Sequence, residues 1–204
     1  MKGNETFICI ALVLATGGCA DVTGPLARTV TAATTPAVLS ENFESPKTTN
    51  YTVYRAGQTL TTSTNTWVVE SGSIDVFNAQ VRREAVPFDG IQAVDLAGSP
   101  GAGVMSTSFA TAPGQRYNIR FYYARNNGLG SNAGRANVAV LGASPLLQAE
   151  LLHQAPRQFN QNVAFSGTFV ADGAKATLRF TSLTGGSYGI TIDGITIRPM
   201  SAPQ

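Results

Sequence analysis

An alternation of apolar and polar side chains over Arg116–Arg125 is the feature that most constrains the fold of this chain. This segment reads RYNIRFYYAR. In a β-strand, neighbouring side chains point to opposite faces, whereas a helix with a period of 3.6 residues mixes the two sets. The residues that we expect on the buried face are Tyr117, Ile119, Phe121 and Tyr123. The sequence therefore predicts a strand that buries one face and exposes the other.

Short segments of the same kind recur between residues 38 and 199, separated by glycine, proline and Asp-Gly turns. Many short strands with such punctuation are typical of an all-β sandwich or barrel. We expect an all-β fold, an antiparallel β-sandwich, with residues 58–65 and 126–134 as loops. The expected strands cover residues 38–44, 51–54, 67–69, 74–77, 91–96, 102–109, 116–125, 136–141, 162–170, 176–180 and 190–197.

The turn residues predict which of these strands are paired. Segments 67–69 and 74–77 are expected to form a hairpin, and segments 162–170 and 176–180 to form a second pair. Residues 146–153 read LLQAELLH, which suits either a strand or a short helix. That segment is the only one for which a helix is a plausible alternative.

The last expected strand contains a break in its alternation. Ile190 and Ile192 share one parity, whereas Ile195 and Ile197 share the other. A shift of one residue moves a side chain to the opposite face of a sheet. The sequence therefore predicts a β-bulge at Asp193–Gly194, which re-aims the aspartate side chain.

The N-terminal part of the chain has the composition of an export signal followed by a tether. Residues 1–19 contain a short apolar segment and then small residues before Cys19, which resembles the lipobox of bacterial lipoproteins. An ordinary signal peptide cut beside Cys19 is the alternative. Residues 20–37 are rich in Thr, Ala and Pro and are expected to be a flexible tether, and residues 200–204 a tail. We expect an exported protein, anchored by a lipid on Cys19 to the bacterial outer membrane or cell surface.

Charge and cysteine content argue against several classes of protein. The net charge is +2 and the sequence has no basic run, so nucleic-acid binding is not expected. The two cysteines are Cys9, inside the apolar segment of the signal, and Cys19. The mature chain is therefore expected to have no disulfide and no thiolate metal site, and to depend on packing for its stability.

Six segments between residues 39 and 198 occur in the order found in one known family. They are NFESP at 42–46, WVVESGSIDVF at 67–77, DGIQAVDLAG at 89–98, APGQRYNIRFYYARN at 112–126, LRFTSL at 178–183 and IDGITI at 192–197. In these segments the chain resembles the DUF642 family and its bacterial relatives, the choice-of-anchor C proteins. The resemblance implies a galactose-binding-domain-like jelly roll in an extracellular protein without established catalysis.

The same resemblance implies two kinds of ligand, sugars and a structural calcium ion near the paired terminal strands. For this chain it places the calcium candidates at Glu44 and Asp193, whose carboxylate oxygens suit this hard cation. The alternative is that Glu44 pairs with an arginine and that Asp193 only shapes the bulge. Members of the family often carry two such domains, whereas this chain has room for one.

The sequence singles out no catalytic residues. It has one histidine, His153, and contains neither a GxSxG nor an HExxH motif. A glycosidase needs two carboxylates that face each other across a cleft, and no such pair is distinguished. Trp67 opens an apolar strand and is expected in the core. We therefore expect a protein that is not an enzyme.

The outward face of the alternating strand offers the chemistry of a sugar site, which combines aromatic rings with side chains that bond hydroxyl groups. Arginines outnumber lysines by eleven to three, and their planar forks suit carboxylates, so an acidic polysaccharide is conceivable. The alternative is a solvated sheet face. The expected ligand-binding residues are Arg116, Asn118, Arg120, Tyr122, Arg125, Asn126 and Tyr188.

Three functions remain open on the sequence alone. The leading hypothesis is a non-catalytic, extracytoplasmic, carbohydrate-binding lipoprotein domain that recognises a cell-wall or extracellular polysaccharide. The second is a structural or protein-interaction module of the cell envelope without a sugar site. The third is a glycan or ester hydrolase.

Overall fold

The computed structural model describes residues 35–83, 86–129, 132–154 and 161–201. Cys19, the predicted signal segment and most of the predicted tether lie outside the described residues. Within the described residues, none of the helices has the length and the apolar character needed to cross a membrane.

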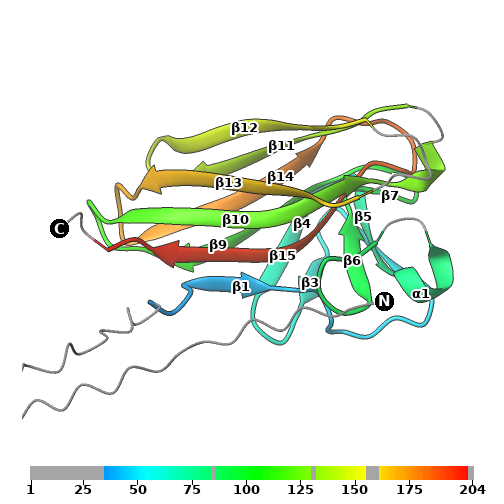
Figure 1. Cartoon of the computed structure of the whole chain (residues 1–204), viewed down its shortest axis with the longest axis horizontal. Coiled ribbons are helices and arrows are strands. Elements are labelled where there is room, and N and C mark those ends of the chain that lie inside the picture. The colour runs from blue at the N-terminus through cyan, green and yellow to red at the C-terminus, as the bar shows by residue number, and fades with distance from the viewer. Residues whose placement is uncertain (1–34, 84–85, 130–131, 155–160, 202–204) are drawn as a thin grey trace, which may run out of the picture. The chain divides into compact units, whose positions relative to one another are not determined.

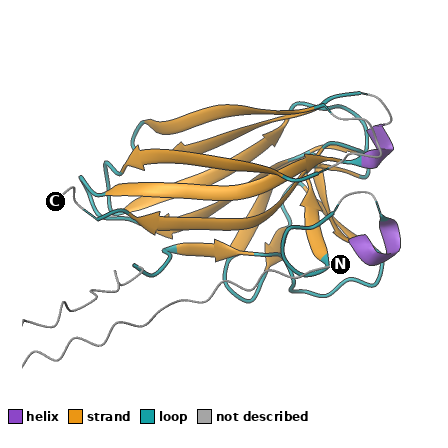
Figure 2. Cartoon of the chain, in the orientation of Figure 1, coloured by secondary structure: helices purple, strands orange, loops and turns teal. Residues whose placement is uncertain are grey.

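The domain consists of two antiparallel sheets that face each other (Figures 1 and 2). The seven-stranded sheet has the order β13 (Val163–Val170), β10 (Arg116–Arg125), β15 (Ile190–Pro199), β6 (Gln92–Asp95), β5 (Ser73–Asn78) and β2 (Tyr51–Arg55), with β1 (Leu39–Glu41) also paired to β15. The six-stranded sheet has the order β12 (Pro145–His153), β11 (Gly134–Leu141), β14 (Lys175–Ser182), β9 (Val104–Ala110), β4 (Thr66–Ser71) and β3 (Thr59–Thr61). The predicted all-β sandwich is thus confirmed.

Small elements complete the described part of the domain. Strands β7 (Ala97–Gly98) and β8 (Gly101–Ala102) form a two-stranded sheet. The helical turn α1 (Ala79–Arg82) follows β5, and the 3-10 turn η1 (Asn127–Leu129) follows β10. Neither turn was expected from the sequence.

The core lies between the two sheets and is built from alternate residues of the strands. Tyr117, Ile119 and Phe121 of β10 are buried there, and Tyr123 is half-buried. Phe121 packs edge-on against Phe180 of the opposite sheet, with ring centroids 5.2 Å apart. Each fully buried side chain of this size contributes about 1.5–3 kcal/mol. The predicted alternation of β10 therefore holds over its first half.

The predicted bulge in β15 is confirmed. Two steps along β10, from Arg120 to Tyr122, correspond to three steps along β15, from Thr196 to Asp193. Gly194 adopts a φ of 62°, which residues with a side chain rarely adopt. Because of the extra residue, all four isoleucines of β15 are buried.

The two predicted strand pairs are wrong, because each pair crosses from one sheet to the other. Strand β4 belongs to the six-stranded sheet and β5 to the seven-stranded sheet, and β13 and β14 are divided in the same way. The first crossing is made at Gly72, which has a φ of 63° and passes so close to the Ala102 carbonyl that a Cβ has no room. Turn residues alone do not distinguish such a crossing from a hairpin.

Other boundaries differ from the predicted ones. Residues 146–153, for which a strand and a helix were both open, form β12. The loop expected over 58–65 contains β3. Strand β1 ends at Glu41, so Glu44 lies beyond it rather than within it. As the calcium hypothesis requires, β1 does pair with β15, with Leu39 opposite Ile197.

Candidate functional site

The polar face of β10 lies on the outer surface of the seven-stranded sheet, as predicted. Arg116 and Arg120 are exposed, and Asn118 and Tyr122 are half-buried. Their neighbours on β13 are small or hydroxyl-bearing, with Thr168 opposite Asn118, Ser166 opposite Arg120 and Ala164 opposite Tyr122. Four of the seven predicted ligand-binding residues therefore share one open face.

An aromatic stack stands on this face. The ring of Phe88 lies parallel to that of Tyr122, with centroids 3.3 Å apart and an angle of 7° between the planes. Phe88 is nevertheless 50% exposed, so much of its ring faces solvent. Phe88 was not predicted as a site residue, because it lies in an irregular segment before β6 where no periodicity in the sequence marks it.

Two hollows lie on either side of Phe88. The first, of about 480 Å³, is lined by residues that include Arg120, Tyr122, Ser166 and Thr196. The second, of about 280 Å³, extends toward β1 and the loop at Thr64, with Asp89 in its lining. Both hollows share Phe88, Gly194 and Thr196. We call the area formed by Phe88, Tyr122, Arg120, Ser166 and Thr196 the Phe88 surface.

The carboxylate of Asp193 fixes the segment that carries Phe88. Its Oδ2 accepts the backbone N–H groups of Phe88 at 2.8 Å and Asp89 at 2.9 Å, and its Oδ1 accepts that of Gly194 at 2.7 Å. Burial raises the pKa of Asp193 to about 7, although the three N–H groups favour its charged form. The bulge thus directs this carboxylate at the Phe88 loop.

Glu44, the second predicted calcium ligand, holds the other end of the same loop. Its Oε1 accepts the backbone N–H groups of Ile91 and Gln92, each at 2.7 Å. The described residues contain no group of three or more acidic, histidine or cysteine side chains placed to hold a metal ion. Calcium binding by Glu44 and Asp193 therefore stays a prediction, while the contacts seen give both carboxylates a structural role.

Arg125 and Asn126 do not continue the exposed face of β10, so this part of the prediction is wrong. They are 0% and 1% exposed. The segment around Gly189 covers this end of the strand, since Asn126 N–H donates to the Gly189 carbonyl at 2.7 Å. The Asn126 side chain donates to Asp95 Oδ2, also at 2.7 Å. Asn126 belongs to a buried polar cluster at the end of the sheet.

Asp95 is the centre of that cluster. Burial raises its pKa to about 8, against the effect of hydrogen bonds from Ala97, Asn126 and Gly189. Asp75 lies opposite it on β5, and the nearby charge raises the pKa of Asp95 further. This cluster lies inside the protein and is not an open site.

Tyr188 is 39% exposed, in line with the prediction that it lies at the surface. It packs against the backbone of Gly128 in η1, where an added Cβ would lie 2.5 Å from its ring. Its contact is therefore with the loop that follows β10. Trp67 is buried, as predicted, and His153 is buried as well.

Glu41 is a buried carboxylate that the sequence analysis missed. It is 3% exposed, and its Oε2 accepts hydrogen bonds from Thr62 Oγ1 at 2.7 Å, Asn65 Nδ2 at 2.9 Å and Trp67 Nε1 at 3.1 Å. Its Oε1 accepts the N–H of Phe43 at 3.0 Å. Glu41 therefore joins β1 to the loop and strand that border the second hollow.

A further hollow, of about 400 Å³, lies on the outer face of the six-stranded sheet. Asn137, Gln148 and Thr181 contribute to its lining, which contains no aromatic side chain. Arg179, also in the lining, forms an ion pair with Glu70 at 2.6 Å. This hollow offers polar groups but no ring on which a sugar stacks.

Comparison with known proteins gives a fold but not a family. No protein-family model matches the chain, including any for DUF642, and no curated protein matches its sequence. The carbohydrate-binding module TmCBM61, solved with β-1,4-galactotriose, matches at 10% identity and a TM-score of 0.53 over 81% of this chain and 99% of that one. The CBM22-1–CBM22-2 tandem of Paenibacillus barcinonensis Xyn10C matches at 17% identity and a TM-score of 0.52, over 85% of this chain and 48% of the tandem. The chain thus has the β-sandwich fold of carbohydrate-binding modules.

Proposed function

We propose that this domain is a non-catalytic carbohydrate-binding module whose ligand lies on the Phe88 surface. The observation that carries the proposal is the half-exposed ring of Phe88, stacked on Tyr122 beside the exposed Arg120. Sugar sites combine an apolar ring face with a few polar groups that fix orientation. Both components occur here side by side, with the ring on the loop before β6 and the polar groups on strands β10, β13 and β15.

The hollow on the six-stranded sheet is the competing location. It has polar side chains, but its arginine is already paired with Glu70 and its lining has no aromatic ring. The Phe88 surface has an exposed ring, a free approach from solvent and hydroxyl groups from Ser166 and Thr196. We therefore assign the ligand to the seven-stranded sheet.

The fold shared with the galactotriose-bound module TmCBM61 supports the class of function without naming the sugar. Lipidation of Cys19, proposed from the sequence, would place the domain outside the cytoplasm, where polysaccharides occur. There the domain would attach the cell envelope to a polysaccharide and would not catalyse a reaction of that polysaccharide.

A glycan array followed by calorimetry tests this proposal. We expect binding to at least one polysaccharide, and a loss of about tenfold or more, or about 1.4 kcal/mol, in Phe88→Ala and Arg120→Ala. Arg135→Ala, which removes an exposed arginine from β11 of the other sheet, is the matched control and should bind normally. Absence of binding to every glycan would favour a structural or protein-interaction module. Normal affinity in both site variants would show that the ligand binds outside the Phe88 surface.

A further inference from the structure

We propose that the polysaccharide bound at the Phe88 surface is anionic, and that Arg116, Arg120 and Arg198 recognise its acidic groups. This inference rests on the carbohydrate-binding function proposed above and names the class of ligand. It starts from the position of the three arginines on the seven-stranded sheet.

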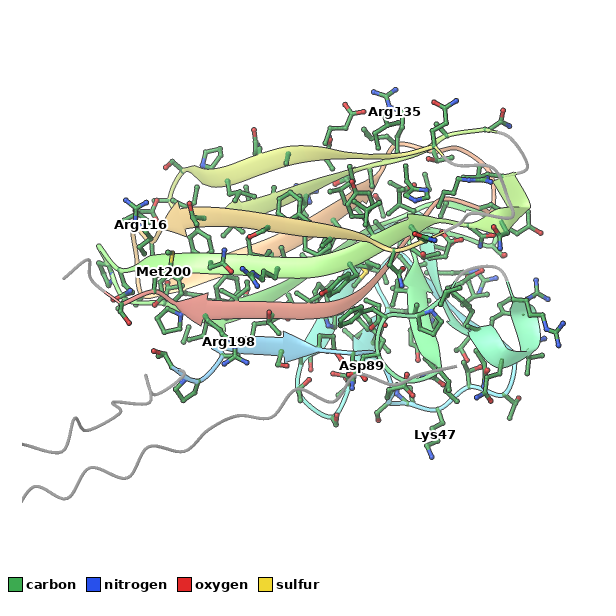
Figure 3. The ribbon with its side chains drawn as sticks, viewed as in Figure 1. Lys47, Asp89, Arg116, Arg135, Arg198 and Met200 are labelled. Carbon is green, nitrogen blue, oxygen red and sulfur yellow. The ribbon has the colours of Figure 1, made fainter. Side chains whose placement is uncertain are left out.

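The sheet register brings the three arginines together on one face. Arg198 of β15 lies directly opposite Asn118 of β10. Arg116 and Arg120 lie two residues to either side of Asn118, on the same face. Diagonal neighbours of this kind are about 7–8 Å apart, within reach of long side chains. Figure 3 shows Arg116 and Arg198 near the Met200 end of the sheet.

Within the part of the chain that the structure describes, no carboxylate forms an ion pair with these arginines. Among the described residues, Arg135 and Arg179 each have a carboxylate within ion-pair distance, at 2.7 and 2.6 Å, but both lie on the other sheet. No such ion pair is formed by Arg116, Arg120 or Arg198 in this part of the chain; Arg198 Nη1 donates only to a backbone carbonyl, that of Thr35. Strand β13, which borders this face, reads VAFSGTFV and carries no charge.

Acidic groups are therefore expected on the ligand rather than on the protein. A guanidinium binds a carboxylate or sulfate through two parallel hydrogen bonds, which gives geometric specificity as well as attraction. The arginines alternate with the hydroxyl groups of Ser166, Thr168 and Thr196, which suit the hydroxyls of a sugar. Arginines that extend along the sheet from a stacking ring, with Arg120 in the same hollow, fit an acidic polysaccharide better than a nucleic acid, since the chain has a net charge of only +2.

The test uses two pairs of polymers, each with one backbone in a charged and a neutral form. Polygalacturonate is compared with its fully methyl-esterified form, and dextran sulfate with dextran, by calorimetry on the full chain. We expect the charged member of at least one pair to bind about tenfold or more tightly than its neutral counterpart, and its affinity to fall as salt rises. Arg120→Gln and Arg198→Gln should each remove much of that preference. Arg135→Gln should retain it.

Arg120→Lys adds a test of geometry, because it keeps the charge and removes the planar fork. Recovery of only part of the preference supports two-point recognition of an acidic group. Equal binding of charged and neutral polymers, or binding only of neutral glycans on the array, would overturn this inference and leave the carbohydrate-binding proposal standing. Failure to bind any glycan on the array or any of the four polymers would remove both. Equally tight binding of a single-stranded oligonucleotide would also overturn the assignment to polysaccharide.

Discussion

Asp193 holds Phe88 in place through a hydrogen bond of 2.8 Å between its Oδ2 and the backbone N–H of Phe88, although 105 positions separate the two residues. Phe88 is half-exposed, whereas Asp193 is only 3% exposed. The contact joins the bulge of the last strand to the loop that carries the aromatic ring. The position of this half-exposed ring thus depends on a carboxylate that solvent hardly reaches.

The first prediction concerns this contact. Asp193→Ala should leave the N–H groups of Phe88 and Asp89 without their acceptor, at a cost of about 1–3 kcal/mol for each group that stays buried. We expect a lower Tm and a glycan affinity that is weaker by about tenfold, both measured on the purified variant. Asp172→Ala, which removes an acceptor of the Ser144 N–H in an exposed turn, is the control. Wild-type affinity in Asp193→Ala would show that the ring does not need this anchor.

The second prediction uses the glycine of the bulge. Gly194→Ala introduces a Cβ that would lie 2.7 Å from Phe88 Cδ1, at a residue whose φ is 62°. Strain at such a backbone costs on the order of 1 kcal/mol, and the new methyl group displaces the ring. Ligand affinity should therefore fall together with Tm. Gly185→Ala, where nothing lies within 4 Å, should change neither value; a Gly194→Ala protein that binds normally would contradict the assigned surface.

The third prediction concerns Glu41. Glu41→Ala removes the acceptor shared by Thr62, Asn65 and Trp67, and we expect a loss of about 2–4 kcal/mol because buried donors are left unpaired. In a domain of this size that loss lowers Tm by on the order of 10 °C in differential scanning calorimetry. Glu150→Ala removes an exposed carboxylate, whose ion pair with Arg135 is screened by solvent, and should leave Tm close to the wild-type value. Similar Tm values for both variants would argue against a structural role for Glu41.

The fourth prediction is a fall in stability with rising pH. Asp95 has a pKa of about 8 and Asp193 of about 7, whereas an unfolded aspartate has one near 3.9. Between about pH 4 and pH 8 the two aspartates keep protons in the native state that they have lost in the unfolded state. The free energy of unfolding therefore declines as pH rises through this range. Burial lowers the pKa of His153, which acts in the opposite direction below about pH 6.5.

The pH range from 7 to 9 therefore isolates the aspartates. Urea unfolding at both ends of this range should show a lower free energy of unfolding at pH 9, by on the order of 1 kcal/mol. Asp95→Asn has no carboxylate to ionise and should show a smaller difference. A wild-type protein that is equally stable at both values would mean that Asp95 is already charged at pH 7.

The fifth prediction tests calcium. Glu44 and Asp193 both accept backbone N–H groups of the loop between β5 and β6, and the calcium hypothesis requires that they also bind the ion. If they do, Tm should be higher with calcium at about 1 mM, in the affinity range of extracellular calcium sites, than with a chelator. Glu44→Gln should remove the difference. Equal Tm values in the two buffers would leave both carboxylates with their structural role alone.

The features that could be predicted from the sequence are those that the alternation of neighbouring residues determines. The buried face of Tyr117, Ile119 and Phe121 follows from a period of two, and the bulge at Gly194 follows from the isoleucines on either side of it. These features depend on neighbouring residues only. The same reasoning placed Arg116, Asn118, Arg120 and Tyr122 on one outward face.

What was missed depends on residues that are far apart in the sequence. The position of Phe88 is fixed by Asp193, and the burial of Arg125 and Asn126 by the segment around Gly189. The two wrong strand pairs have the same origin, because sheet membership is decided by the partners of β4 and β13 elsewhere in the chain. Such contacts leave no periodic signal.

The pairing of β1 with β15 has a practical consequence for how this domain is fused to another protein or immobilised on a surface. Leu39 lies opposite Ile197, so the polypeptide enters and leaves the domain side by side, next to Arg198. A fusion partner or sensor surface joined directly at Val38 or at Met200 therefore stands beside the arginines of this face. If that attachment is negatively charged and lies within about 8–10 Å of these arginines, it will compete with an acidic polymer for them. A neutral spacer will restore access to the arginines.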